Sequence, residues 1–305
     1  MSSINKHILT VHLDIEPLRQ VPQPAAYLED VETSNATSLP PLLMLHGFMG
    51  TKACWLPLIE QLKSSRFQDS AWERRCISLD LMGFGESGKP AIRYDIAKEV
   101  AFVRCVVEAL KLDPCYIIGH SFGGWVASAY ALQYPNAVKG LILAAPAGIR
   151  DDSFCGRYDH LRPLLWPTPV VDWALRLAKP FANTTDKRAT LDRISWFRQE
   201  LMSQPAARSF LLDRMRPEDA IDTVEKEIHR LRVPTLVITG DSDETIPKWH
   251  SETYAKEIPA AQIAIIPGAS HALPQNHASE MAELILQFLA SSIQSFPALN
   301  HDISV

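Results

Sequence analysis

The sequence predicts an α/β protein with a mostly parallel central sheet, helices on both faces of the sheet and an inserted helical cap. Short, nearly continuous apolar runs alternate with segments of helical periodicity, which is typical of parallel strands buried on both faces. From residue 150 to about residue 232 this alternation stops, and a helix-biased segment rich in aromatic residues and arginines takes its place. The 305 residues are enough for one large α/β domain with such an insertion.

The strands are predicted in chain order from the apolar runs. Two alternating segments, HILTVHLDI (7–15) and AAYLED (25–30), predict a pair of edge strands that leads into the sheet. Six nearly continuous runs then predict core strands: PLLMLHG (41–47), RCISLDL (75–81), CYIIG (115–119), VKGLILAAP (138–146), TLVITGD (235–241) and QIAIIPG (262–268).

Helices are predicted between these strands, where apolar residues recur every three or four positions. The clearest run is 94–112, in which Ile96, Val100, Val103 and Val107 share one face. Further helices are expected near 53–64, near 124–134 and over about 277–292. From the place of the irregular segment we expect one core domain and one helical cap: residues 1–149 with 233–305, and residues 150–232.

Composition and charge exclude several classes of function. The formal net charge is −5, from 30 basic and 35 acidic residues, so nucleic acid is not an expected partner. The N-terminal stretch lacks the apolar core of a signal peptide, and no run approaches the roughly 18 apolar residues of a membrane span. We therefore expect a cytoplasmic protein. Its five cysteines have no metal-ligand spacing and are interpreted as reduced thiols.

One serine lies where a predicted strand turns into a predicted helix. Ser121 stands between Gly119 and Gly123, after the apolar run CYII and before GWVASAYAL. A nucleophilic serine must stand clear of the backbone, and the sharp turn that achieves this leaves room only for small residues two positions to either side. We therefore interpret Ser121 as a nucleophile rather than as part of a chance glycine turn.

A serine hydroxyl needs a base to become nucleophilic. His271 follows the last predicted core strand, at the end where strands of such sheets present catalytic groups to ligands, and we favour it as the base. His277 is expected to begin the final helix, His120 to point away from Ser121, and His46 to order a loop.

The imidazole in turn needs a carboxylate that fixes its tautomer. The run TLVITGDSDETIP offers Asp241, Asp243 and Glu244, and we favour Asp243, with Asp241 as the main alternative. The resulting chain order of serine, acid and histidine is the one described for enzymes with this type of serine turn.

Two backbone N–H groups are expected to bind the oxyanion that forms during attack on a carbonyl. Phe122 begins the helix after Ser121, so its N–H is free of an intrahelical acceptor. The second donor is expected to be the N–H of Phe48, in the loop after LLMLHG, with Met49 as its neighbour.

These motifs resemble those of the α/β-hydrolase superfamily. The stretches that carry the resemblance are LHGFMG (45–50), DLMGFGESGKP (80–90), GHSFGG (119–124), GDSDETIP (240–247) and GASH (268–271). In the acid loop of the superfamily the aspartate three residues after the glycine is usual, which supports Asp243. The resemblance covers about residues 40–290 and implies an α/β-hydrolase fold and serine chemistry without a metal or organic cofactor.

Individual positions distinguish among members of the superfamily. Haloalkane dehalogenases and most epoxide hydrolases of this fold use an aspartate where this chain has Ser121, so those chemistries are disfavoured. Carbon–carbon bond hydrolases often have a tryptophan after the catalytic histidine, where Ala272 stands here. Many relatives have an acidic residue a few positions further on, in the region of Asn276.

The expected function is hydrolysis of a small or medium carboxylic ester by Ser121, His271 and Asp243 through an acyl-enzyme. The main alternative is a hydrolase of a carbon–carbon bond in a dicarbonyl ring-fission product. Further alternatives are perhydrolase or haloperoxidase-like activity, a lyase-like reaction of the menaquinone pathway, and a catalytically silent binder.

The pocket residues are predicted less directly. Met49 adjoins an expected oxyanion donor, and Trp166, Trp173 and Trp196 are expected either to line the pocket or to form the core of the cap itself. The expected partner is a small-molecule ester, and the oligomeric state is left open.

Overall fold

An eight-stranded sheet forms the centre of the protein. The computed structural model describes residues 4–19, 21–30, 39–64, 74–154, 163–182, 185–213 and 222–294. The strand order is β1-β2-β4-β3-β5-β6-β7-β8. The strands span Ile4–His12 (β1), Pro22–Asp30 (β2), Leu42–Leu45 (β3), Cys76–Leu79 (β4), Cys115–His120 (β5), Val138–Ala144 (β6), Thr235–Gly240 (β7) and Ala261–Ile266 (β8).

The sheet is mostly parallel, as the apolar runs predict. All pairings from β4 through β3, β5, β6 and β7 to β8 are parallel. The two alternating N-terminal segments form β1 and β2, which pair antiparallel with each other, and β2 pairs antiparallel with β4. The prediction of an edge pair that leads into the sheet is confirmed.

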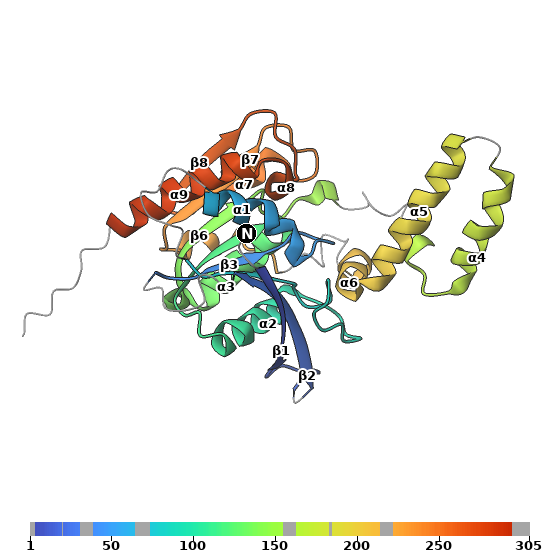
Figure 1. Cartoon of the computed structure of the whole chain (residues 1–305), viewed down its shortest axis with the longest axis horizontal. Helices are drawn as coiled ribbons and strands as arrows, with labels where there is room; N and C mark the ends of the chain where they lie inside the picture. Colours follow the sequence, from blue (N-terminus) through green and yellow to red (C-terminus); the bar gives the residue numbers. More distant parts are fainter. Residues whose placement is uncertain are drawn as a thin grey trace, which may run out of the picture.

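Helices cover both faces of the sheet, because successive residues of a strand point to opposite sides. In β3, Leu43 and Leu45 pack in one core cluster with residues of the helices Ile96–Ala109 (α2) and Phe122–Gln133 (α3). Leu42 and Met44 of the same strand pack in a second cluster with residues of the helices Leu56–Ser64 (α1) and Ala278–Gln294 (α9). Figure 1 shows α1 and α9 on one side of the sheet and α2 and α3 on the other.

Four helices of this core lie near the ranges that the periodicity predicts, whereas Lys248–Glu257 (α7) and Leu273–Asn276 (α8) were not predicted. Asp95 begins α2 as an N-cap residue, since its carboxylate accepts the N–H of Lys98 at 2.8 Å. The core helices span Leu56–Ser64 (α1), Ile96–Ala109 (α2), Phe122–Gln133 (α3), Lys248–Glu257 (α7), Leu273–Asn276 (α8) and Ala278–Gln294 (α9). Short 3₁₀ turns span Lys52–Trp55 (η2), Pro135–Ala137 (η3), Asp152–Phe154 (η4), Lys179–Phe181 (η6) and Ile228–Arg230 (η8).

Three further helices lie between β6 and β7 in the chain. They span Pro169–Ala178 (α4), Thr185–Ser203 (α5) and Pro205–Asp213 (α6). Figure 1 shows α4 and α5 as a hairpin that extends away from the sheet, with α6 between the hairpin and the core. The division into a core and a cap at residues 150 and 232 stays a prediction. In the described ranges, we find no helix with the length and apolar content of a bilayer span.

Candidate active site

The turn at Ser121 is held in a conformation that few side chains adopt. Ser121 lies between β5 and α3 with φ 52° and ψ −114°, a region that is rare for residues other than glycine. A Cβ at Gly119 would lie 2.4 Å from the carbonyl oxygen of Gly123, and a Cβ at Gly123 would lie 2.1 Å from that of Leu45. Close packing of three chain segments therefore requires the two glycines that flank the serine.

Asp243 and His271 pair at the ends of two neighbouring strands. Asp243 follows β7, His271 follows β8, and Asp243 Oδ2 lies 2.8 Å from His271 Nδ1. Asp243 Oδ1 accepts the N–H groups of Thr245 at 2.8 Å and Ile246 at 2.9 Å. Burial raises the pKa of Asp243, but the hydrogen bonds from His271 and the two N–H groups outweigh it, so that the pKa lies below its usual value. The carboxylate is thus ionised and oriented toward the imidazole.

The alternative acid and base residues have other partners. Asp241 Oδ1 accepts the N–H of Gly268 at 2.7 Å, so it closes the loop after β8 rather than contacting His271. His277 Nδ1 lies 3.1 Å from Glu280, at the start of α9. His46 Nε2 accepts the N–H of Leu81 at 3.0 Å, so its ring fastens the loop after β3 to the loop after β4.

His120 connects the turn at Ser121 with the loop after β8 that carries His271. Its Nε2 lies 2.8 Å from the backbone carbonyl oxygen of His271, and the centroids of the two rings are 4.8 Å apart. Since a carbonyl oxygen only accepts, Nε2 carries the proton. Burial lowers the pKa of His120 to about 3, so the ring is neutral at pH 7. No hydrogen bond joins Ser121 Oγ to His271 in this structure. The two residues are connected by His120, which precedes Ser121 in the chain and contacts His271.

The two expected oxyanion donors lie at the start of α3 and in the loop after β3. Phe122 is the first residue of α3, so its N–H has no acceptor within the helix. Phe48 lies in the loop after β3, and its ring centroid is 6.1 Å from that of Phe122. Met49, the next residue, has φ 57°, which gives the loop a sharp bend.

A buried ion pair between Lys52 and Asp80 fixes the loop after β3. Asp80 is fully buried and accepts the N–H of Lys52 at 2.6 Å, the ammonium of Lys52 at 2.7 Å and the N–H of Glu86 at 2.8 Å. The Lys52 ammonium also contacts Glu86 at 2.6 Å. Because every oxygen of Asp80 has a partner, the segments after β3 and β4 are fixed to each other.

The structure adds aromatic residues that the sequence reasoning missed. The ring of Phe122 lies 5.8 Å from that of Phe84, after β4, and 4.9 Å from that of Phe210, on α6. Phe84 was within a recognised motif, whereas nothing in the sequence connects Phe210 with Ser121. Trp125, on α3, donates its Nε1–H to the carbonyl of Asp222 at 3.0 Å.

The structure does not bring the three tryptophans expected in the pocket to Ser121. Trp166, Trp173 and Trp196 are 61%, 60% and 62% exposed, and they lie in or beside the hairpin that extends away from the sheet. With these exposures they form no buried core of the hairpin, and none of them contacts Ser121. Met49, by contrast, is partly buried against the main core cluster.

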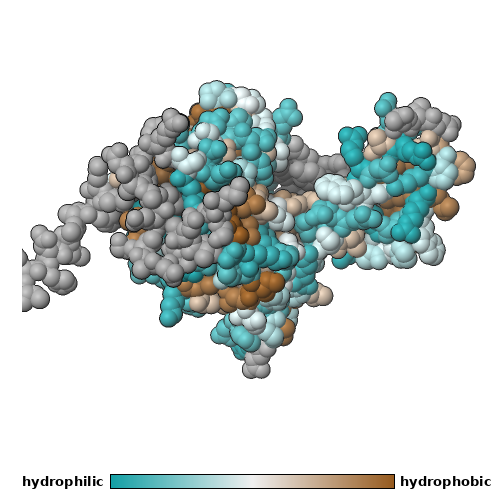
Figure 2. Space-filling view, viewed as in Figure 1, coloured by the Kyte–Doolittle hydropathy of each residue, from teal (hydrophilic) through white to brown (hydrophobic). Residues whose placement is uncertain are grey.

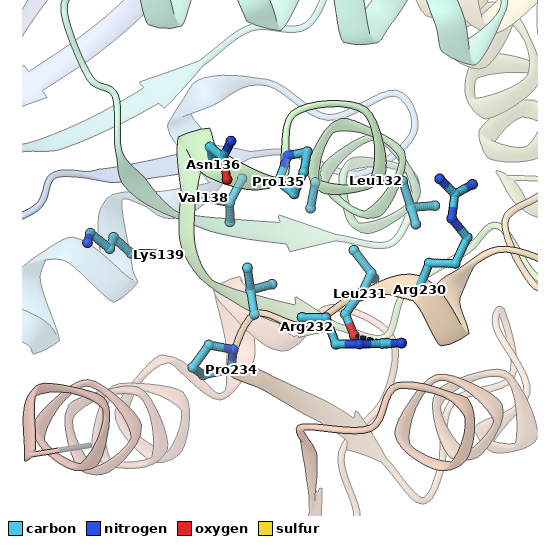
Figure 3. Close-up of a pocket in the computed structure, with 11 residues that line it drawn as sticks. Leu132, Pro135, Asn136, Val138, Lys139, Arg230, Leu231, Arg232 and Pro234 are labelled. Atoms are coloured by element: carbon cyan, nitrogen blue, oxygen red, sulfur yellow. Dashed lines mark hydrogen bonds between the residues drawn. The ribbon is translucent and has the colours of Figure 1, made fainter. Parts of the chain in front are cut away.

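A separate cavity lies at the opposite end of the strands. Figure 3 shows its lining, which includes Val138 at the start of β6 and Pro234 just before β7. Its volume is about 400 Å³, and it contains none of the predicted site residues. Within the described ranges no group of three or more His, Cys, Asp or Glu side chains is arranged to hold a metal ion.

Comparison with curated proteins gives relatives with different reactions. A 2-hydroxymuconate semialdehyde hydrolase of Pseudomonas putida is 32% identical over 229 residues, which cover 73% of this chain and 79% of its own length. The monoacylglycerol lipase ABHD6 of Homo sapiens is 26% identical over 266 residues, with 83% and 76% coverage.

Solved structures show the same fold at lower identity. An esterase from Thermogutta terrifontis matches with a TM-score of 0.68 and 22% identity, covering 94% of this chain and 99% of its own. A meta-cleavage product hydrolase from Pseudomonas fluorescens matches with a TM-score of 0.65 and 22% identity, covering 93% and 98%. The model of the alpha/beta hydrolase family matches residues 42–284. The chain therefore belongs to the alpha/beta hydrolase family and is a hydrolase.

Proposed function

We propose that this hydrolase cleaves a small or medium carboxylic ester through an acyl-enzyme on Ser121. The observation that carries the proposal is the pair formed by His271 and the buried, ionised Asp243, which lies beside the strained turn at Ser121. In the same proposal, residues 150–232 form a cap over the core domain.

The reaction has two halves. Ser121 Oγ attacks the ester carbonyl carbon while its proton passes to His271 Nε2, and the carbonyl electron pair moves to the oxygen. The N–H groups of Phe48 and Phe122 bind that oxyanion. When the C–O bond breaks, the leaving alkoxide takes the proton from His271. Water then gives a proton to His271 and attacks the acyl carbon, and Ser121 leaves with that proton as the acid is released.

The surroundings of Ser121 favour an apolar acyl group. Phe48, Phe84, Phe122 and Phe210 form a chain of ring contacts with centroid separations of 4.9–6.1 Å. Such rings bury apolar area and offer no charge to a substrate. An alkyl or aryl ester fits this chemistry better than a charged dicarbonyl.

A second candidate is hydrolysis of a carbon–carbon bond in a dicarbonyl, which the relative named a 2-hydroxymuconate semialdehyde hydrolase supports. This reaction calls for a cation that binds the substrate carboxylate. Three arginines in the described part of residues 150–232 have other partners. Arg198 bonds to Asp172, Arg208 donates to the carbonyl of Leu165, and Arg150 pairs with Asp152.

The experiment that separates the candidates compares substrates on one preparation. We expect p-nitrophenyl esters from acetate to laurate to be hydrolysed with a maximum at one chain length, and Ser121→Ala to abolish the activity. A ring-fission dienoate should turn over far more slowly. Faster turnover of the dienoate than of every ester would establish the second candidate instead.

A further inference from the structure

The hairpin of α4 and α5 carries a continuous apolar stripe on its surface. Trp166, Val170, Trp173, Leu177 and Phe181 are 61%, 63%, 60%, 70% and 81% exposed. Val170, Trp173 and Leu177 are three and four residues apart and therefore lie along one side of α4. Phe181 lies in the 3₁₀ turn η6 directly after α4, and Trp166 lies three residues before the helix. No residue of α4 is buried. Figure 2 shows hydrophobic residues along the outer edge of this hairpin.

The stripe is held on a fixed scaffold. Arg198 on α5 is 1% exposed and reaches to the start of α4. Its Nε and Nη2 bond to the Asp172 carboxylate at 2.8 and 2.9 Å, and its remaining N–H groups donate to the carbonyls of Leu164, Trp166 and Thr168. A bidentate, buried arginine of this kind fixes the two helices relative to each other. The exposed apolar side chains of the stripe therefore keep fixed positions relative to one another.

The hairpin that carries the stripe has more cations than anions. Residues 163–203 contain six Lys and Arg and four Asp and Glu, although the whole chain has a net charge of −5. Two of the four acids are already paired, Asp172 with Arg198 and Asp192 with Lys179. Three exposed cations form no hydrogen bond or ion pair with a residue that the structure describes: Arg176, Arg188 and Arg193.

We infer that this hairpin binds the surface of an anionic phospholipid bilayer, with the apolar stripe at the level of the headgroups. Tryptophan, phenylalanine and leucine on one side of a helix, with arginine and lysine around them, are typical of helices that lie in a lipid–water interface. Unpaired arginines would be attracted to anionic headgroups. A second copy of this chain would instead bring the same excess of cations against itself.

The position of the hairpin connects the lipid surface with the site. The helix that follows α5, α6, carries Phe210 against Phe122, next to Ser121. A bilayer in contact with α4 would therefore be connected with the serine through α6, which lies between the hairpin and the core. The inference concerns binding alone, and it holds whichever bond the enzyme cleaves.

The test is flotation of the full chain as Ser121→Ala with phospholipid vesicles, either zwitterionic alone or containing an anionic phospholipid. We expect binding to the anionic vesicles that weakens as salt rises. In the double variant Trp173→Ser/Leu177→Ser, binding should fall at least tenfold. The variant should keep its circular dichroism spectrum and melting temperature, because both side chains are already exposed. Arg188→Glu/Arg193→Glu should weaken binding to the anionic vesicles only.

A matched control changes exposed apolar residues elsewhere. Trp249 and Ile265 are 42% and 46% exposed on α7 and β8, and Trp249→Ser/Ile265→Ser should bind as the parent does. The inference is overturned if the parent does not float with any vesicle, or if the Trp173/Leu177 variant floats equally well. It is also overturned if sedimentation shows that the parent is a dimer and that, among the variants, only Trp173→Ser/Leu177→Ser is a monomer. Ester hydrolysis is measured separately, so its absence would contradict the proposed function and not this inference.

Discussion

The Nε2 atom of His120 lies 2.8 Å from the backbone carbonyl oxygen of His271, which ties the residue before the proposed nucleophile to the proposed base. His271 is therefore held at two points, since its Nδ1 also lies 2.8 Å from Asp243. One contact fixes the main chain of the loop and the other fixes the ring. Nε2 of His271, the atom proposed to accept the serine proton, forms no hydrogen bond with a residue that the structure describes.

Replacing His120 should disturb the position of His271 without removing a reacting group. For His120→Ala we expect kcat to fall about ten- to a hundredfold, with KM little changed, because a small displacement of a catalytic group has effects of this size. Steady-state kinetics on the best p-nitrophenyl ester measures both constants. His277→Ala is the matched control and should keep the parent rate, because His277 contacts Glu280 instead. Equal rates for the two variants would contradict the role of His120.

Asp243→Asn keeps the shape of the side chain and removes its charge. The amide can donate to His271 Nδ1, which favours the wrong tautomer of the imidazole. We expect kcat to fall by about 10³- to 10⁴-fold, as it does in serine–histidine–aspartate enzymes when the same change places the imidazole in the wrong tautomer. Asp241→Asn should have a far smaller effect, because Asp241 contacts Gly268. A larger loss in the Asp241 variant would make Asp241 the catalytic acid.

The buried ion pair of Lys52 with Asp80 should be important for stability. Asp80→Ala leaves the ammonium of Lys52 buried with Glu86 as its remaining carboxylate partner, and we expect a loss of about 3–5 kcal/mol in the free energy of unfolding. Lys6→Ala removes an exposed ion pair with the same Glu86 and should cost about 0–1 kcal/mol. Urea unfolding of both variants measures the difference. Similar losses would show that burial does not distinguish the two pairs.

Glu99 predicts a pH dependence of stability. It is fully buried on α2, and burial raises its pKa well above the usual value, although the N–H of Met82 donates to its Oε2 at 3.1 Å. Between the unfolded and folded pKa values the native state binds the proton and the unfolded state does not. Stability from this group therefore falls as pH rises above about 4.3.

Glu99→Gln removes this titration while keeping an oxygen that can accept from Met82. Relative to the parent, the variant should gain stability as pH rises from 5 to 8, by at most about 1.4 kcal/mol per pH unit. Urea unfolding of both proteins at four pH values in that range gives the difference directly. A difference that does not change with pH would mean that Glu99 is ionised in the folded protein.

Local patterns predicted the sheet and the serine turn because their causes are local. The apolar runs place β3 to β8, and the spacing of Gly119, Ser121 and Gly123 follows from one strand-to-helix turn. Phe210 and the contact between His120 and His271 could not be predicted in this way. They join segments that are distant in the chain, and no periodicity encodes which side chains meet there. The exposure of Trp173 likewise depends on how the hairpin of α4 and α5 packs against the rest of the protein. The composition of the hairpin does not determine this packing.

Covalent labelling of Ser121 tests the central claim most directly. The protein is treated with a fluorophosphonate, and the intact mass and the modified peptide are measured beside residual ester hydrolysis. The account predicts one adduct per chain, located on Ser121, with hydrolysis lost in proportion to labelling and no adduct in Ser121→Ala. Hydrolysis that persists after full labelling, or in Ser121→Ala, would contradict the assignment of Ser121 as the nucleophile.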